Sequence, residues 1–316
     1  MGDMAEDMDV AGVVDRGESE LHFQPEVDLG TGQLTGMEAL VRWSHPARGL
    51  LWPADFLPAV REAGLLPALG RWVAGRVAAE VTRWPLGTRC TVNVSAEEVT
   101  NPSWAVELAA VVAAAGVPPG ALLLDIPAAA LTESTSAGLV EALHAAGVLV
   151  ATAGPAPAGV PVDVLTVGRA LVAAVETDDA ARAAVAALVA TGLPVAANGV
   201  ETWAEAAVLH GLGVQRATGF LFGAPQRADR TRWQLAGGST WRGSYVGDGT
   251  GWGHTQPAQA LDRELAGEVV AALPDTQEVP AVRAGLLPRP SDPLAAAAVP
   301  AVAPPVIVVR PRRLGD

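Results

Sequence analysis

The sequence contains no lysine, because all 21 of its basic Lys and Arg residues are arginine. A catalytic lysine can therefore stand nowhere in the chain, not even at a displaced position. The absence has a simple alternative cause, since a composition rich in Ala, Gly, Pro and Arg is typical of a very GC-rich genome. The chemical consequence is the same under either cause.

Cysteine and long apolar runs are also scarce. The single cysteine, Cys90, excludes an intramolecular disulfide, and the lack of a Cys or His cluster excludes a thiolate metal site. We expect Cys90 to be an inert buried residue. No basic, apolar signal-peptide pattern stands at the N-terminus, and Pro or charge interrupts each apolar run before membrane-spanning length. These features predict a cytoplasmic protein without a membrane partner.

Positive charge is low overall, with a formal net charge of −13 and a pI near 4.8. Nucleic acids and anionic membranes need clustered positive charge, so neither is an expected partner. An anionic small molecule would need a local arginine site.

Three regions differ in composition along the 316 residues. Residues 1–19 are acidic and predict a flexible arm. Residues 20–227 alternate short apolar runs with helical patterns and predict one domain. Residues 228–316 are rich in Gly, Pro and Ala and predict a mostly disordered tail, with a short helix at 258–273.

The middle region carries eight short apolar runs suited to a sheet that is buried on both faces. The expected strands are Leu21–Val27, Leu34–Trp43, Cys90–Val94, Leu122–Ile126, Val148–Thr152, Val162–Val167, Pro194–Ala197 and Val214–Ala217. The expected helices are Ala54–Ala63, Leu66–Trp84, Trp104–Ala115, Ser136–Ala146, Asp178–Thr191 and Trp203–Leu212, several of them ending at glycine. This order predicts an α/β fold, a closed (β/α)₈ barrel like the TIM barrel with an antiparallel first strand. An open doubly wound sheet is the alternative.

Ligands of such barrels bind at the carboxyl ends of the strands. The residues expected there are Glu38, Asn93, Asp125, Ala153, Gly154, Thr166, Asn198 and Thr218.

Around these positions the sequence resembles the EAL domain, the cyclic di-GMP phosphodiesterase family. The opening segment from Phe23 to Leu66 matches almost throughout, including Glu38-Ala39-Leu40 and Arg42-Trp43. Later matches are TVNVS, LLLDI, PVDVL, NGVET and GFLFGAP, in the expected order and spacing over residues 20–225. An isolated EAL triplet would carry no weight, whereas this ordered set is specific.

The resemblance implies hydrolysis of one phosphodiester of cyclic di-GMP with two Mg²⁺ or Mn²⁺ ions held by oxygen ligands. Glu38 and Asn93 match the family's metal ligands, and Asp125 stands where the family has Glu. The family's paired aspartates fall on Ala153 and Gly154, its lysine on Thr166, an acid on Asn198 and a glutamine on Thr218. The resemblance therefore implies a degenerate member without catalytic residues.

The remaining positions leave two interpretations of each residue open. By resemblance, the expected ligand-binding residues are Gln24, Glu38, Leu40, Arg42 and Glu201. Arg42 either binds a phosphate or makes a surface ion pair, and Gln24 either reaches a guanine or satisfies backbone groups. Glu38, Asn93 and Asp125 either hold Mg²⁺, Mn²⁺ or Ca²⁺ weakly or form a polar cluster without metal, so no cofactor is required. His45 is expected to be structural, and Trp43, Trp52 and Trp72 to pack in the core or at the barrel lip.

The function expected from these matches is that of a catalytically inactive EAL-domain protein of cyclic di-GMP signalling. It would act as a receptor for the dinucleotide or as a scaffold for a protein partner. The alternative is a weak metal-dependent phosphodiesterase. The segment PAPAGV shortens the loop that contributes to the family's dimer contact, so a homodimer is not expected.

Overall fold

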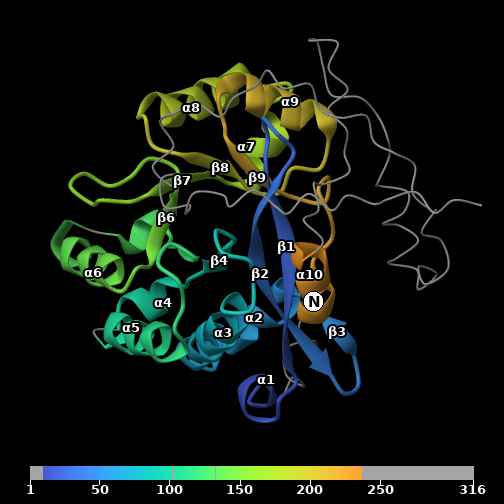
Figure 1. Ribbon diagram of the computed structural model, residues 1–316, viewed down its shortest axis with the longest axis vertical. Helices are drawn as coiled ribbons and strands as arrows, with labels where there is room; N and C mark the ends of the chain where they lie inside the picture. The colour runs from blue at the N-terminus through green and yellow to red at the C-terminus, as the bar shows by residue number, and fades with distance from the viewer. Residues whose placement is uncertain (1–9, 102, 132, 237–316) are drawn as a thin grey trace, which may run out of the picture.

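Eight strands close into a barrel in the computed structural model, which describes residues 10–101, 103–131 and 133–236 (Figure 1). The barrel strands are β1 (Ser19–Asp28), β2 (Leu34–His45), β4 (Arg89–Asn93), β5 (Leu122–Asp125), β6 (Leu149–Ala153), β7 (Val164–Val167), β8 (Val195–Ala197) and β9 (Arg216–Thr218). The pairs from β2–β4 round to β8–β9 are parallel, while β1 is antiparallel to both β2 and β9. The predicted barrel with an antiparallel first strand is confirmed, and the open-sheet alternative is wrong.

Helices cover the outside of the barrel. They are α2 (Pro53–Glu62), α3 (Leu66–Val81), α4 (Ala96–Val99), α5 (Trp104–Ala115), a 3₁₀ turn (Ala128–Ala130), α6 (Glu133–Ala145), α7 (Arg169–Ala174), α8 (Asp179–Ala190) and α9 (Trp203–Leu212). Helices α7–α9 gather beside β7–β9, and α3–α5 lie on the side of β4 (Figure 1). Gly116 and Gly213 end α5 and α9 with φ of 69° and 97°, the left-handed conformation that glycine adopts most readily.

The sequence boundaries of the domain need correction at both ends. Helix α1 (Gly12–Asp15) lies in the expected flexible arm, yet Val13 is fully buried against Trp43 and Phe56. Helix α10 (Ala228–Ala236) lies in the expected tail, yet it contacts β1 and buries Thr231 and Leu235. Two short strands, β3 (Gly49–Leu51) and β10 (Gln226–Arg227), extend β2 and β1. The expected helix at 258–273 lies outside the described residues.

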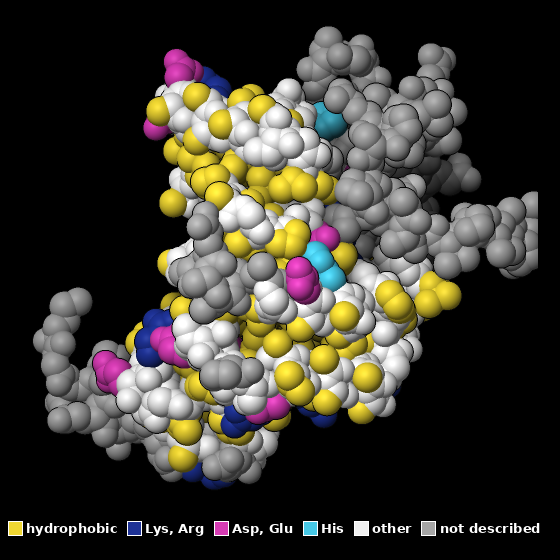
Figure 2. Space-filling model, turned by 90° about the vertical axis from the view of Figure 1, so that its left-hand side faces the viewer, with side chains coloured by type: hydrophobic (Ala, Val, Ile, Leu, Met, Phe, Trp, Pro, Cys, Tyr) yellow, Lys and Arg dark blue, Asp and Glu magenta, His cyan; other side chains and the backbone are white. Residues whose placement is uncertain are grey.

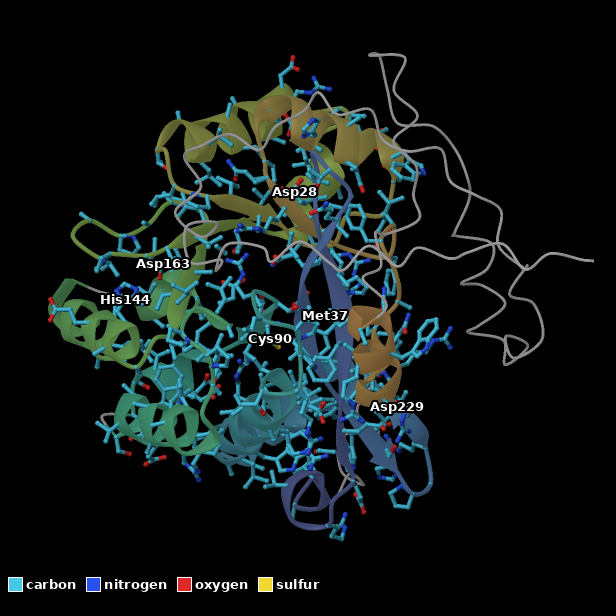
Figure 3. The ribbon with its side chains drawn as sticks, viewed as in Figure 1. Asp28, Met37, Cys90, His144, Asp163 and Asp229 are labelled. Carbon is cyan, nitrogen blue, oxygen red and sulfur yellow. The ribbon has the colours of Figure 1, made fainter. Side chains whose placement is uncertain are left out.

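The core contains the expected apolar strand residues and Cys90. Cys90 is fully buried beside Met37, its register partner on β2 (Figure 3). Burial raises the pKa of the Cys90 thiol well above its usual range, so the thiolate that would react is disfavoured. Among the described helices, none is long and apolar enough to cross a membrane.

A buried carboxylate joins three strands inside the barrel. Glu26 on β1 lies 3.7 Å from the Arg89 guanidinium on β4 and 3.9 Å from that of Arg216 on β9. All three side chains are nearly inaccessible to solvent. The opposite charges offset part of the desolvation cost of burying them.

Candidate functional site

The residues expected at the strand ends do meet at one end of the barrel. Glu38 lies inside β2 rather than at its end, but its register places it beside Thr91, two residues before Asn93 on β4. The Asn93 side-chain amide donates to Glu38 Oε1 at 2.8 Å, and the Thr218 hydroxyl donates to Glu38 Oε2 at 3.3 Å. Both oxygens of this carboxylate therefore have a donor, one from the neighbouring strand β4 and one from β9, which β1 separates from β2.

Asp125 is held in the same way from the other side. The Thr166 hydroxyl donates to Asp125 Oδ2 at 3.2 Å, and the side chain of Asn198 also hydrogen-bonds this carboxylate. Thr218 lies 3.5 Å from Asn198 Oδ1, but its single hydroxyl proton favours the closer Glu38 oxygen. Three of the five substituted positions thus provide donors to the two surviving carboxylates.

The other two substituted positions provide no side-chain group. Ala153 ends β6, and Gly154 follows it with a φ of +79° while its N–H donates to the Thr166 carbonyl at 3.0 Å. This left-handed conformation suits glycine best, and among residues with a side chain Asn and Asp adopt it most readily. The backbone therefore restricts the side chains that position 154 accepts without by itself excluding an aspartate.

Burial sets the ionisation of both carboxyls. Burial raises the pKa of Glu38, and the nearby Asp125 charge adds to that rise, while the bonds from Asn93 and Thr218 oppose it. Burial likewise raises the pKa of Asp125 to about 6, against the bonds from Thr166 and Asn198. The space among Glu38, Thr166, Asn198 and Thr218 is about 10 Å³, roughly that of one water molecule.

The raised pKa of Asp125 predicts a pH-dependent stability. The carboxyl has a pKa of about 6 in the fold against an ordinary value of 3.8, so the folded state binds the extra proton between these values. The free energy of unfolding should therefore fall as pH rises from about 4 to about 6, by on the order of 3 kcal/mol. Asp125→Asn cannot titrate, so in urea denaturation it should match the unsubstituted chain at pH 4 and exceed its stability at pH 7.5.

A matched variant controls for general charge effects in that experiment. Asp179→Asn removes a carboxylate that is 96% exposed on α8, and it should leave the difference between pH 4 and pH 7.5 nearly unchanged. The explanation fails if Asp125→Asn keeps the same loss of stability over this pH range as the unsubstituted chain.

Four of the expected ligand-binding residues line a second, larger pocket of about 280 Å³. They are Gln24, Leu40, Arg42 and Glu201, and they are joined there by Trp52, Pro53, Ala54, Arg169, Gly199, Gly219, Phe220 and Pro225. Glu38 lines the small inner space instead. The pocket is therefore built from the middle of β1, the second half of β2, the starts of α2 and α7, and the segments that follow β8 and β9.

Two of these residues already have partners in the fold. The Gln24 side-chain amide donates to the Gly223 carbonyl at 2.9 Å. This bond corresponds to the alternative in which Gln24 satisfies a backbone group. Arg42 is only 1% exposed, its Nη1 donates to the Val41 carbonyl at 2.8 Å, and its guanidinium carbon lies 4.0 Å from the centre of the Trp52 ring. The expected alternative of a surface ion pair at Arg42 is wrong, because the side chain is buried.

Burial also lowers the pKa of Arg42 to about 10, while the negative charges of Glu38 and Glu20 act to raise it. The guanidinium still carries its proton at neutral pH.

Glu201 has a partner that was not predicted from the sequence. Arg169 is the first residue of α7, and its guanidinium makes an ion pair with the Glu201 carboxylate. The signal was available, since Arg169 stands two residues after the end of β7, at the carboxyl end of the barrel.

Other singled-out residues have structural contacts. His45 Nδ1 accepts from the Ala47 and Arg48 amides in the turn after β2, as expected of a structural residue. Asp163, in the PVDVL segment, accepts from the Val150 amide and contacts His144 Nε2, both at 2.8 Å (Figure 3). The Asp163 pair connects the start of β7 to β6 and α6.

The side chains at the barrel mouth that could offer oxygen ligands to a metal ion include two carboxylates, Glu38 and Asp125, and two amides, Asn93 and Asn198. Within residues 10–101, 103–131 and 133–236, no group of three or more His, Cys, Asp or Glu side chains is placed to hold a metal ion. Mg²⁺ gives up its water shell reluctantly and needs near-octahedral oxygen ligands.

Comparisons with known proteins agree with this architecture. A sequence model of a family described as "EAL domain" matches residues 7–225. A protein of Caulobacter vibrioides, described as an uncharacterized signaling protein, is 33% identical over 232 residues, covering 69% of this chain and 29% of that protein. MucR of Pseudomonas aeruginosa, described as a bifunctional diguanylate cyclase/cyclic di-GMP phosphodiesterase, is 30% identical over 240 residues, covering 70% of this chain and 35% of that protein. The chain thus spans about a third of the length of these relatives.

Solved structures show the same fold. The PaMucR phosphodiesterase in complex with c-di-GMP superposes with a TM-score of 0.66 at 28% identity, covering 71% of this chain and 98% of that one. The EAL domain of DcpA from Mycobacterium smegmatis superposes with a TM-score of 0.58 at 28% identity, covering 70% of this chain and 98% of that one.

Proposed function

This chain belongs to the EAL domain family, and we propose from that premise that it binds intact cyclic di-GMP without hydrolysing it. Its EAL domain is of the kind found in cyclic di-GMP signalling proteins. Fold alone does not establish an activity, so the proposal rests on the residues at the two parts of the site.

The observation that carries the proposal is the hydrogen bonding of the surviving carboxylates. Glu38 and Asp125 accept from Asn93, Thr218, Thr166 and Asn198. Three of these donors stand where the resemblance places the lysine, an acid and a glutamine of the enzyme. The oxygens that would bind ions are instead satisfied by protein donors, and this donor set does not fit a two-metal site.

The larger pocket supports retention of the ligand. Gln24, Leu40, Arg42 and Glu201 line it together with two exposed aromatic residues, Trp52 and Phe220. Apolar walls with a few polar groups are typical of small-molecule sites. On the face shown in Figure 2, basic side chains are scattered among hydrophobic and uncharged ones, unlike the continuous basic surface that a nucleic acid needs.

Calorimetric titration with cyclic di-GMP in the presence of Ca²⁺ tests the proposal. We expect saturable binding and recovery of the intact dinucleotide. Leu40→Asp places a carboxylate in the pocket and should abolish binding through repulsion of the phosphates. Leu86→Asp makes the same change at a side chain that is 78% exposed and outside the lining, and it should bind normally. Absence of binding to the unsubstituted chain would reject the receptor function and favour the scaffold.

A further inference from the structure

The larger pocket offers two arginines to an anionic ligand, Arg42 and Arg169. In a chain with a formal net charge of −13, a phosphodiester needs at least one accessible guanidinium for charge compensation. The two side chains differ sharply in accessibility, and this difference decides which of them a phosphate reaches.

Arg42 lies beneath the Trp52 ring. The guanidinium carbon is 4.0 Å from the ring centre, and the whole residue is 1% exposed. One terminal nitrogen is bonded to the Val41 carbonyl. Although Arg42 lines the pocket, very little of its guanidinium is therefore accessible to a phosphate while the indole covers it.

The start of α2 holds Trp52 in that position. The Trp52 amide donates to Asp55 Oδ2 at 2.9 Å, and Pro53 begins the helix directly after it. Such a bond gives a partner to a backbone N–H at the start of a helix and fixes the direction in which the chain enters the helix. The backbone that carries the indole is thus anchored, and stacking of the cation on the ring face adds further attraction.

Arg169 has the opposite environment. Its side chain is 67% exposed and that of its partner Glu201 is 44% exposed. An exposed ion pair of this kind contributes at most about 1 kcal/mol. Because a guanidinium has five N–H donors, Arg169 can keep its bond to Glu201 and still offer a free pair of donors to a phosphate.

Gly199 makes room for the Arg169 side chain. A Cβ atom added at Gly199 would lie 2.7 Å from Arg169 Cγ and 3.0 Å from its Cβ. The missing side chain lets the arginine stem lie across the loop after β8, towards Glu201. Gly199 and Glu201 are therefore positioning residues for Arg169.

We infer that Arg169, held by Glu201 over Gly199, is the phosphate-binding residue of the larger pocket, and that Trp52 keeps Arg42 out of this role. The inference rests on the proposed receptor function, because it names the contact by which that pocket holds cyclic di-GMP. It departs from the alternative, left open by the sequence, that Arg42 binds a phosphate.

The test compares single arginine variants in calorimetric titrations with cyclic di-GMP. Arg169→Ala should weaken binding at least tenfold and make the remaining affinity less sensitive to NaCl, since one charge contact is lost. Arg42→Gln removes the charge while keeping a side-chain N–H donor, and it should change affinity by less than twofold. Arg182→Ala is the control, because this arginine is also paired with an acid on the surface but does not line the pocket.

A double variant tests the role of Trp52. In an Arg169→Ala background, Trp52→Ala should recover at least threefold in affinity, because it uncovers Arg42. Three results would each overturn the inference. The first is unchanged binding by Arg169→Ala, and the second is a tenfold loss of affinity in an Arg42→Gln protein of normal thermal stability. The third is no recovery of affinity in the double variant. If the unsubstituted chain does not bind cyclic di-GMP, both the receptor function and the inference are rejected. If it binds and Arg169→Ala leaves the affinity unchanged, only the role of Arg169 is rejected.

Discussion

Cyclic di-GMP incubated with this chain and Mn²⁺ should yield no linear dinucleotide product. The resemblance requires a bridging aspartate pair, a lysine, an acid and a glutamine at positions that hold Ala153, Gly154, Thr166, Asn198 and Thr218. Each lost charged group removes stabilisation of the transition state of roughly a few kcal/mol, and each ~1.4 kcal/mol is a factor of ten in rate. Together these losses put the expected rate below detection by chromatography.

The assay needs a variant that separates this chain's activity from a contaminating phosphodiesterase. Glu38→Ala removes a carboxylate that accepts from Asn93 and Thr218 in the barrel mouth. Product formed equally by the unsubstituted chain and by Glu38→Ala comes from a contaminant. Turnover by the unsubstituted chain that Glu38→Ala abolishes would establish the weak phosphodiesterase alternative and reject the inactive receptor.

The barrel could be predicted because its strands carry a strong local signal. Each expected strand overlaps one observed barrel strand, and the helix at Trp203–Leu212 has the expected bounds. Most of the missed elements are short: α1 and α4 have four residues, β3 three, β10 two and α7 six. Such lengths are too small for a periodic pattern of apolar residues to identify them. Helix α10 has nine residues and was missed because the chain from residue 228 onwards is rich in Gly, Pro and Ala.

The candidate site was predictable only as a set of positions. Strand order placed Glu38, Asn93 and Asp125 at one end of the barrel, and the structure shows the bonds that the neighbouring substituted residues make to them. The sequence could not show that Trp52 covers Arg42, because the contact joins the start of α2 to β2 through side-chain packing. Contacts of this kind depend on the relative placement of elements, which hydrophobic periodicity does not determine.

Gly219→Ala should strongly destabilise the fold. A Cβ atom at this position would lie 2.0 Å from the Val200 carbonyl oxygen and 2.3 Å from its amide nitrogen. These are backbone atoms, and the Val200 amide and carbonyl are already bonded to the Thr218 carbonyl and the Leu221 amide. The clash can be relieved only by separating the end of β9 from the loop that carries Asn198 and Glu201. We therefore expect a loss of at least about 4 kcal/mol in the free energy of unfolding, which is exceptionally large for a single substitution.

Urea denaturation of Gly219→Ala beside Gly75→Ala isolates the steric cause. Gly75 lies inside α3, is exposed, and has no atom within 4 Å of an added Cβ. The same change there should stabilise the chain by about 0.5–1 kcal/mol, because alanine favours a helix interior over glycine. If Gly→Ala lowers the free energy of unfolding at position 219 and raises it at position 75, the close approach of β9 to the Val200 backbone is what holds the loop after β8 in place. A Gly219→Ala protein within 1 kcal/mol of the unsubstituted chain would contradict that close approach, and with it the placement of Asn198 beside Asp125.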